Sequence, residues 1–200
     1  EAAIAEKADA IFVHHGLFWR GQTGVVTGWM RERLRLLLAH DINLYSYHLP
    51  LDAHPTLGNN SQLGQQLGLI GPDASASGNI THFGEQQLGW MANIEPNSNE
   101  ALKQPVTLHK HLEYILNRPV AGVFNAKNAI KSIAWCSGGA QSYFEAAINA
   151  GADAFITGEM SEPQAHLARE CGVAYFACGH HATERYGAPA VADHVADMLG

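Results

Sequence analysis

Apolar residues along the chain fall into short runs of strand length that alternate with segments of helical spacing. The strand-like runs are rich in β-branched and aromatic residues. They cover residues 8–13, 43–47, 130–135, 152–157 and 173–177. Apolar residues recur on one helical face in three further segments, which are 31–40, 107–117 and 161–170. An amphipathic helix is also expected to run to Ala150. Strands that alternate with helices are typical of α/β folds.

One strand–helix–strand pattern occurs twice in this order. The first copy lies within residues 8–47 and the second within 152–177. In the second copy the helix opens on Ser161 as its cap, with Glu162 in its first turn. We therefore predict an α/β fold with two pseudo-twofold related halves, each containing a βαβ unit. The strand ends of the two halves are expected to converge on one site.

The same pattern predicts how the chain is divided. Residues 1–57 form a first α/β half, 58–128 a connecting or inserted segment, and 129–200 a second α/β half, all within a single compact body. Because the chain begins without methionine, we interpret it as a piece of a longer protein whose first half is truncated at its start. In the middle segment, 71–79 and 93–99 have the composition of loops, and a hairpin around 80–89 is expected in a small inserted subdomain.

Composition and charge narrow the function classes. Hydrophobic residues make up 46% and charged residues 16% of the chain, which is the balance of a globular protein. The net charge of −7 argues against a nucleic-acid partner. No apolar run is long enough to span a membrane. Three cysteines without a C-x-x-C spacing favour a reducing cytoplasm over a disulfide framework. Histidine is over-used, with 12 residues, which indicates a metal site.

A histidine with a carboxylate four residues later follows two of the predicted strands. The pairs are His48 with Asp52 and His180 with Glu184. This spacing places both side chains on one helical face, and both residue types are metal ligands. Pro50 weakens the argument for the first pair, so His48 either binds the metal itself or lies behind Asp52 and donates a hydrogen bond to it.

Adjacent histidines end another predicted strand. His14 and His15 precede Gly16, and both side chains can converge on one site only if the strand ends there. The alternative is one buried and one exposed histidine. The helical spacing selects His180 as the partner of Glu184 and leaves the adjacent His181 pointing elsewhere. Six further histidines lack comparable context and are interpreted as surface or packing residues: His54, His82, His109, His111, His166 and His194.

A glycine turn follows the strand-like run at 130–135. Gly138 and Gly139 lie where a strand passes into a helix, and backbone amides at such a turn can bind an anion such as phosphate. The glycines can equally serve only close packing between strand and helix. The sequence leaves both interpretations open.

Five short motifs together resemble one known family. They lie at 14–16, 49–55, 58–60, 156–159 and 179–184. In combination they resemble the GTP cyclohydrolase I type 2 homologue family, and within it the bacterial YbgI-like dinuclear metal-binding proteins. The resemblance implies a toroidal homohexamer and two divalent metal ions per subunit. The ligands that it implies are His14, His15, Asp52, His180 and Glu184, with Glu184 bridging.

This ligand set predicts a metal-dependent hydrolase. Imidazoles and carboxylates suit Zn, Fe, Mn, Co or Ni without choosing among them. Paired ions can hold a bridging hydroxide that attacks a small, nucleotide-like substrate, and the family name implies ring opening of GTP. Glu159 is either a base or second-shell carboxylate or the cap of the Ser161 helix, while Trp19 and Arg185 are candidates for binding the base and the phosphate of a substrate. The alternatives are a non-enzymatic protein for metal storage, delivery or regulation, and an interaction scaffold with an exposed apolar patch.

Overall fold

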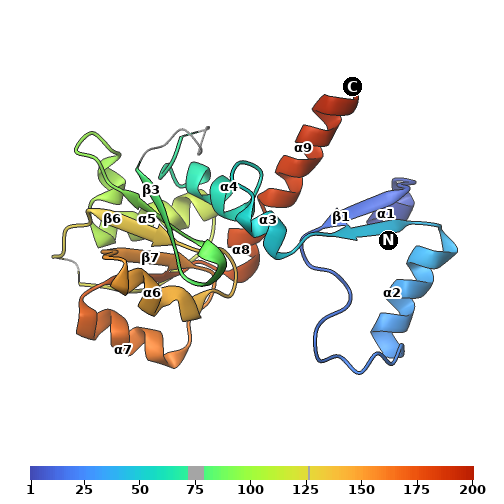
Figure 1. Cartoon of the computed structure of the whole chain (residues 1–200), viewed down its shortest axis with the longest axis horizontal. Coiled ribbons are helices and arrows are strands. Elements are labelled where there is room, and N and C mark those ends of the chain that lie inside the picture. The colour runs from blue at the N-terminus through green and yellow to red at the C-terminus, as the bar shows by residue number, and fades with distance from the viewer. Residues whose placement is uncertain (72–78, 126) are drawn as a thin grey trace.

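The protein consists of two lobes that meet at the candidate site (Figure 1). The computed structural model describes residues 1–71, 79–125 and 127–200. The small lobe holds a parallel pair of strands, β1 (Ala10–Val13) and β2 (Asn43–Ser46), in register from Ala10 opposite Asn43 to Val13 opposite Ser46. Helices α1 (Ala2–Ala5) and α2 (Gly28–Ala39) accompany them. Both strands run toward the large lobe, so their carboxyl ends lie at the junction.

The large lobe is built on a six-stranded sheet in the order β3-β4-β6-β7-β8-β5. Its central strands β6 (Ser132–Trp135), β7 (Ala154–Thr157) and β8 (Ala174–Ala177) are parallel, while β3 (Ile80–Phe83), β4 (Gly89–Asn93) and β5 (Ala121–Val123) pair antiparallel. Every residue of β6 and β7 is buried, which explains their continuous apolar sequences. The segment between 58 and 128 therefore contributes three strands to the same sheet as the second predicted half.

Helices cover both faces of this sheet. On one face α5 (Pro105–Leu116) buries Leu108, Leu112 and Leu116 in a cluster with Leu63 of α4 (Asn59–Gln66). On the other face α6 (Phe144–Asn149) and α7 (Glu162–Cys171) pack against a second cluster around the sheet. Short helices α3 (Leu49–Ala53) and α8 (His180–Glu184) lie where the lobes meet, and α9 (Gly187–Leu199) projects from the junction. Single 3₁₀ turns lie at Glu85–Gln87, Glu100–Leu102 and Gln141–Tyr143.

The mixed α/β class is confirmed, and each predicted strand is present. Each lobe contains a βαβ unit, β1-α2-β2 in the small lobe and β7-α7-β8 in the large one, while a twofold relation between them stays a prediction. Ser161 caps α7 as expected, in a capping box with Gln164. The hairpin is longer than predicted and runs from Ile80 to Asn93. Most of the loop expected at 71–79 lies outside the described residues.

Helix α5 begins earlier than its sequence pattern predicted. Its N-cap is Gln104 and Pro105 occupies the first turn, where a missing N–H costs nothing. The sequence pattern predicts a helix that begins at Thr107 as its cap, and this start is wrong, because the Thr107 hydroxyl donates to the Gln104 carbonyl from within the helix. Among the described residues, no helix combines the length and the apolar character needed to cross a bilayer.

Candidate metal centre

His14 is held in the junction with one ring nitrogen facing the site. Its imidazole is 8% exposed, and Nδ1 lies 3.1 Å from the Tyr47 carbonyl oxygen. A carbonyl only accepts hydrogen bonds, so Nδ1 carries the proton and Nε2 keeps its lone pair. That Nε2 lies 3.4 Å from Asp52 Oδ2 and 3.6 Å from Glu184 Oε1. The histidine is therefore oriented as a ligand before any ion binds.

Glu184 lies at the centre of the histidines. Its Oε2 is 3.0 Å from His180 Nε2, one turn earlier in α8, and 3.1 Å from His15 Nε2. The other nitrogen of His180, Nδ1, lies 2.6 Å from Glu159 Oε1. Glu159 thus orients the ring of His180, and Gln164 rather than Glu159 completes the cap of α7.

Asp52 presents one carboxylate oxygen to the site, and its other oxygen accepts hydrogen bonds from neighbouring side chains. Asn59 Nδ2 donates to its Oδ1 at 2.9 Å and Ser137 Oγ donates to the same atom at 3.2 Å. Asp52 is 6% exposed. Because Oδ1 is satisfied, Oδ2 is left to face His14, which is the arrangement expected of an oriented ligand.

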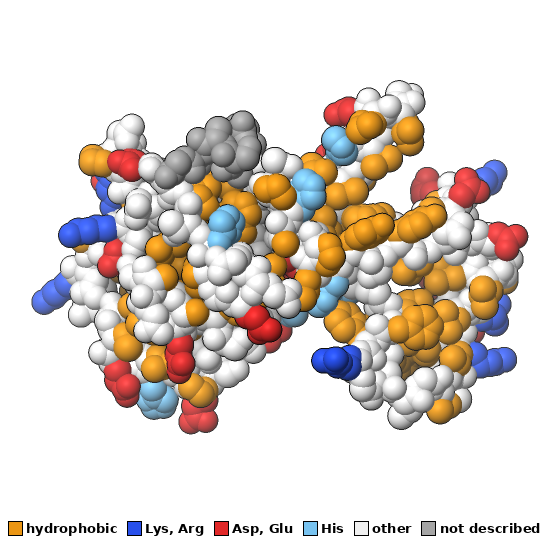
Figure 2. Space-filling view, in the orientation of Figure 1, with side chains coloured by type: hydrophobic (Ala, Val, Ile, Leu, Met, Phe, Trp, Pro, Cys, Tyr) orange, Lys and Arg blue, Asp and Glu red, His pale blue; other side chains and the backbone are white. Residues whose placement is uncertain are grey.

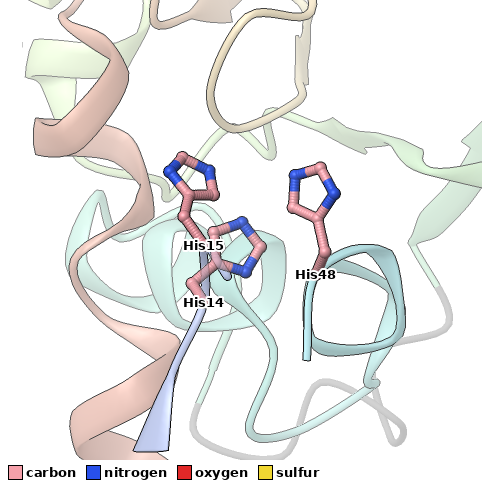
Figure 3. A group of neighbouring side chains, drawn as sticks. All are labelled: His14, His15 and His48. Atoms are coloured by element: carbon pink, nitrogen blue, oxygen red, sulfur yellow. The ribbon is translucent and has the colours of Figure 1, made fainter. Parts of the chain in front are cut away.

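His48 lies with the other histidines rather than behind Asp52. Its ring centroid is 4.9 Å from that of His14 and 5.2 Å from that of His15. Figure 3 shows the three rings gathered side by side, two from the end of β1 and one from the start of α3. The Asp52 amide donates to the His48 carbonyl at 3.2 Å, but within the described parts of the chain no hydrogen bond or ion pair joins the two side chains.

The side chains form three overlapping groups with metal-ligand geometry. In each group one nitrogen or oxygen per residue lies within 4.8 Å of the others. The groups are His14 with His15 and His48, His15 with His180 and Glu184, and His14 with Asp52 and Glu184. His14 Nε2 and Glu184 Oε2 are buried without a hydrogen-bond partner. Such buried polar atoms are costly, and a cation would satisfy both, so the donor set fits a metal.

Burial and mutual charge shift the pKa values within this cluster. Burial would lower the pKa of His14, but the nearby carboxylates of Glu184 and Asp52 outweigh burial and raise it. Burial, together with the neighbouring histidines, lowers the pKa of His15. Burial raises the pKa of Asp52, helped by the charge of Glu184, whereas for Glu184 the surrounding histidines overcome burial and lower the pKa. Two close carboxylates in one buried site repel each other, and a cation between them relieves that repulsion.

A cavity of about 460 Å³ opens beside these residues. Five of its lining residues belong to the cluster: His15, His48, Asp52, His180 and Glu184. The rest of its wall is largely apolar and includes Trp19, Leu88 and Tyr143. Figure 2 shows histidine side chains at the surface between the lobes, so the junction is open to solvent. A volume of this size suits a small organic ligand.

Residues 1–200 match the family described as Duf34/NIF3 (NGG1p interacting factor 3). The chain belongs to the Duf34/NIF3 family. The "GTP cyclohydrolase 1 type 2 homolog" of Neisseria meningitidis serogroup B is 46% identical over 198 residues, which are 99% of this chain and 74% of the relative. The protein of the same name from Yersinia pestis is also 46% identical, over 200 residues that cover 99% of this chain and 74% of the relative.

Solved structures agree with this assignment of the Duf34/NIF3 chain. The structure described as "protein ybgI, unknown function" is 41% identical, has a TM-score of 0.83 and covers 98% of this chain and 74% of that one. Reduced HcgD from Methanocaldococcus jannaschii has a TM-score of 0.79 over 98% of this chain and 73% of that one, at 22% identity, and so supports the fold. The predicted family is therefore confirmed.

Some of the residues predicted to bind substrate in this Duf34/NIF3 chain line the cavity beside the cluster, and others do not. Trp19 and Gly139 line the cavity beside the cluster. The Gly138 amide donates to Thr183 Oγ1 at 2.9 Å, which favours the packing interpretation of this glycine. Arg185 donates to the Leu116 carbonyl and borders a second cavity, of about 680 Å³, that also reaches Glu184. Its guanidinium is thus held away from the first cavity.

Two buried asparagines support the site and were not assigned a role from the sequence. Asn60 Nδ2 donates to the backbone oxygens of Asp52 and Leu88, and its Oδ1 accepts from the Ser137 amide at 2.8 Å. Asn59 joins Asp52 to the Gly187 amide at the start of α9. Both are fully buried. The adjacent Gly58-Asn59-Asn60 motif was the available signal, but the partners of these amides are too distant in sequence to infer.

Replacing Glu159 with glutamine should weaken metal binding without removing a ligand. Glutamine keeps the size of the side chain but not the charge that holds His180 Nδ1 at 2.6 Å. Loss of such an orienting carboxylate typically costs ~10–100-fold in metal affinity. Competition titration with a chromogenic chelator measures the change. Glu162→Gln, an acidic residue in the first turn of α7, is the control and should bind metal as the wild type does. Unchanged affinity in Glu159→Gln would contradict the orienting role.

Only one cysteine should react with alkylating reagents in the folded protein. Burial raises the pKa of Cys136 and of Cys178 to about 12, so neither forms the reactive thiolate near neutral pH. Cys171 is exposed at the end of α7. We expect one iodoacetamide adduct per chain, located at Cys171 by peptide mass spectrometry, and none in Cys171→Ser. An adduct on Cys136, which lines the cavity, would show that this wall opens in solution.

Proposed function

We propose that this chain is a dinuclear metal-dependent hydrolase that acts on a small heterocyclic, nucleotide-like substrate. The ligands proposed for two divalent ions are His14, His15, Asp52, His180 and Glu184. One observation carries the proposal. His14 Nε2 and Glu184 Oε2 are buried without hydrogen-bond partners, and both residues belong to the groups with metal-ligand geometry. Bound divalent ions would supply a nucleophile of lowered pKa and polarise the electrophile of the substrate.

The protein's own residues prepare this chemistry by fixing ligand geometry. Asn59 and Ser137 hold one oxygen of Asp52, so that its other oxygen cannot turn from the site. The Tyr47 carbonyl fixes the tautomer of His14. Glu159 performs the same task for His180. Preorganisation of this kind means that little rearrangement is needed when the substrate arrives.

Proton transfer is assigned to His48. Its imidazole lines the cavity beside His14 and His15, and it begins α3 next to the apolar wall. Histidine is the side chain most often used as a general acid or base. It can accept a proton from the attacking water and return it to a ring nitrogen as the carbon–nitrogen bond of the heterocycle breaks. The curated relatives' name, GTP cyclohydrolase 1 type 2 homolog, supports a ring-opening reaction of this class.

The experiment that tests the proposal combines metal analysis with turnover. Inductively coupled plasma mass spectrometry should find two divalent ions per chain in the wild type. A panel of nucleotides and related heterocycles should then reveal hydrolysis that disappears with chelation and returns with metal. His111→Gln is the control, because His111 contacts the Leu67 carbonyl far from the cluster, and it should keep full metal content. Bound metal without turnover of any compound would replace the hydrolase with metal storage or delivery.

The assembly and location of the protein are part of the same proposal. We propose that it acts as a homohexamer in the cytoplasm. Sedimentation-velocity ultracentrifugation of the purified protein tests the first statement, and a single species with the mass of six chains is expected. A monomer at micromolar concentration would contradict it.

A further inference from the structure

Glu159, which orients His180, is itself contacted at three points. Its backbone carbonyl accepts a hydrogen bond from the Tyr175 hydroxyl at 2.6 Å. One carboxylate oxygen, Oε1, lies 2.6 Å from His180 Nδ1, and the other, Oε2, accepts from Gln141 Nε2 at 3.4 Å. The Glu159 side chain is 45% exposed. An exposed carboxylate rotates among several rotamers, and the contact with Gln141 restricts that rotation.

The same arrangement holds Asp52 in the cluster. The Asn59 amide donates to Asp52 Oδ1 and leaves Oδ2 to face the site. At Glu159 the Gln141 amide donates to Oε2 and leaves Oε1 for the histidine. In both cases an amide holds a carboxylate through one oxygen, so that the other oxygen keeps its direction. Asp52 faces the cluster directly, whereas Glu159 acts through His180.

The backbone of Gln141 is fixed by helix α7. Its carbonyl accepts a hydrogen bond from Gln164 Nε2 at 3.1 Å. Gln164 Oε1 in turn accepts from the Ser161 amide at 3.0 Å, within the capping box of α7. Gln164 is buried, so water competes little for these bonds. A line of hydrogen bonds therefore runs from the start of α7 through Gln141 and Glu159 to His180.

The other amide atom of Gln141 is buried and unpaired. Within the described residues, its Oε1 has no hydrogen-bond partner. Turning the amide over would place Oε1 against the Glu159 carboxylate, where two acceptors repel, so Nε2 stays on Glu159 and Oε1 stays unpaired. A buried acceptor without a donor destabilises a fold. Fold stability alone therefore does not account for a glutamine at this position, whereas its contact with Glu159 does.

We propose that Gln141 is a positioning residue of the metal centre, which acts through Glu159 to fix the ring of His180. This inference rests on the proposed function only in that divalent ions bind at the cluster. It also ties the geometry of one ligand to the start of α7, because Gln164 of the capping box holds the Gln141 carbonyl.

Gln141→Met tests the proposal, because it removes the amide and keeps a side chain of similar length. Loss of a carboxylate that orients a ligand costs ~10–100-fold in metal affinity, so loss of the group that holds this carboxylate should cost about three- to tenfold. Competition with a chromogenic chelator measures the affinity. The visible absorption bands of the Co²⁺-loaded protein report ligand geometry, and those of Gln141→Met should move toward those of Glu159→Gln. Gln141→Ala places no longer apolar chain in this space and should give the same changes.

A double variant shows whether Gln141 acts through Glu159. In Glu159→Gln the charge to be positioned is absent, so adding Gln141→Met should change the metal affinity by less than about twofold. Because the two proteins then bind metal equally, their melting temperatures compare the fold alone. The double variant should melt at the same temperature or higher, since it has lost an unpaired buried acceptor. A clearly lower melting temperature would mean that Gln141 supports the fold instead, and would overturn the inference.

Gln62 provides the matched control. It is a half-buried glutamine of α4 whose Nε2 donates to the Thr56 carbonyl at 2.7 Å, and it borders a different cavity. Gln62→Met should lower the melting temperature and leave the metal affinity and the Co²⁺ spectrum unchanged. If Gln62→Met weakens metal binding as much as Gln141→Met does, the effect is not specific to the contact with Glu159 and the inference fails.

The remaining outcomes separate this inference from the proposed function. Wild-type affinity and an unchanged Co²⁺ spectrum in Gln141→Met overturn the inference and leave the hydrolase in place, as do additive losses in the double variant. A wild type that binds two ions but hydrolyses none of the compounds overturns the hydrolase and leaves the role of Gln141. A wild type that binds no divalent ion overturns both.

Discussion

Replacing Glu184 with glutamine should leave a folded protein that no longer holds metal. Glutamine keeps the volume of the buried side chain but removes the charge that lies 3.0 and 3.1 Å from two imidazole nitrogens. Glu184 belongs to two of the three ligand groups, so both proposed ions lose a partner at once. Because a single orienting carboxylate already changes metal affinity ~10–100-fold, loss of a shared ligand should exceed ~100-fold. Mass spectrometry of the dialysed protein should find less than one ion per chain.

A second histidine–glutamate pair provides the matched control. His109 and Glu113 in α5 have the same spacing, with Nε2 and Oε1 3.8 Å apart, but they lie outside the cluster. Glu113→Gln removes the same charge at the same helical spacing and should retain full metal content and activity. If Glu184→Gln keeps its ions, or if Glu113→Gln loses them, the assignment of Glu184 as the shared ligand fails.

The parts of the site that could be predicted were those fixed by local geometry. His180 and Glu184 share a helix, so their contact follows from a spacing of four residues. The burial of β6 and β7 likewise follows from continuous apolar sequences. These features depend on residues that are close along the chain. The ligands that are distant in sequence were predicted only through the resemblance to a family.

The parts that could not be predicted depend on partners far apart in sequence. Ser137 donates hydrogen bonds to the side chains of Asn60 and of Asp52, which lies 85 residues away in the sequence. No periodicity in the sequence indicates either pair. His48 was paired with Asp52 because of their spacing, but His48 is the N-cap of α3 and has a non-helical ψ, and its ring centroid lies 4.9 Å from that of His14. Strand pairing is similarly non-local, which is why the place of β5 beside β8 was not foreseen.

Replacing Gly138 with alanine should destroy the metal site, although Gly138 is not itself a proposed ligand. Gly138 has a positive φ of 68°, a conformation that costs other residues roughly 1–2 kcal/mol. A Cβ at this position would also overlap Glu184 Oε1 and lie 3.3 Å from His180 Nε2. Gly138→Ala must therefore displace the shared carboxylate, and we expect loss of bound metal together with a lower melting temperature. Metal analysis and calorimetric melting measure the two effects.

The neighbouring glycine separates this steric effect from a general effect on the turn. A Cβ on Gly139 would meet Glu159 and His180 at 3.5 Å, which is ordinary van der Waals contact. Gly139→Ala should therefore keep metal and nearly wild-type stability, although it lies next to Gly138 and also borders the cavity. Equal loss of metal in both variants would mean that the turn itself, rather than the space reserved for Glu184, controls the site. If Gly138→Ala still bound metal as the wild type does, Glu184 would not occupy this position in the metal-bound protein.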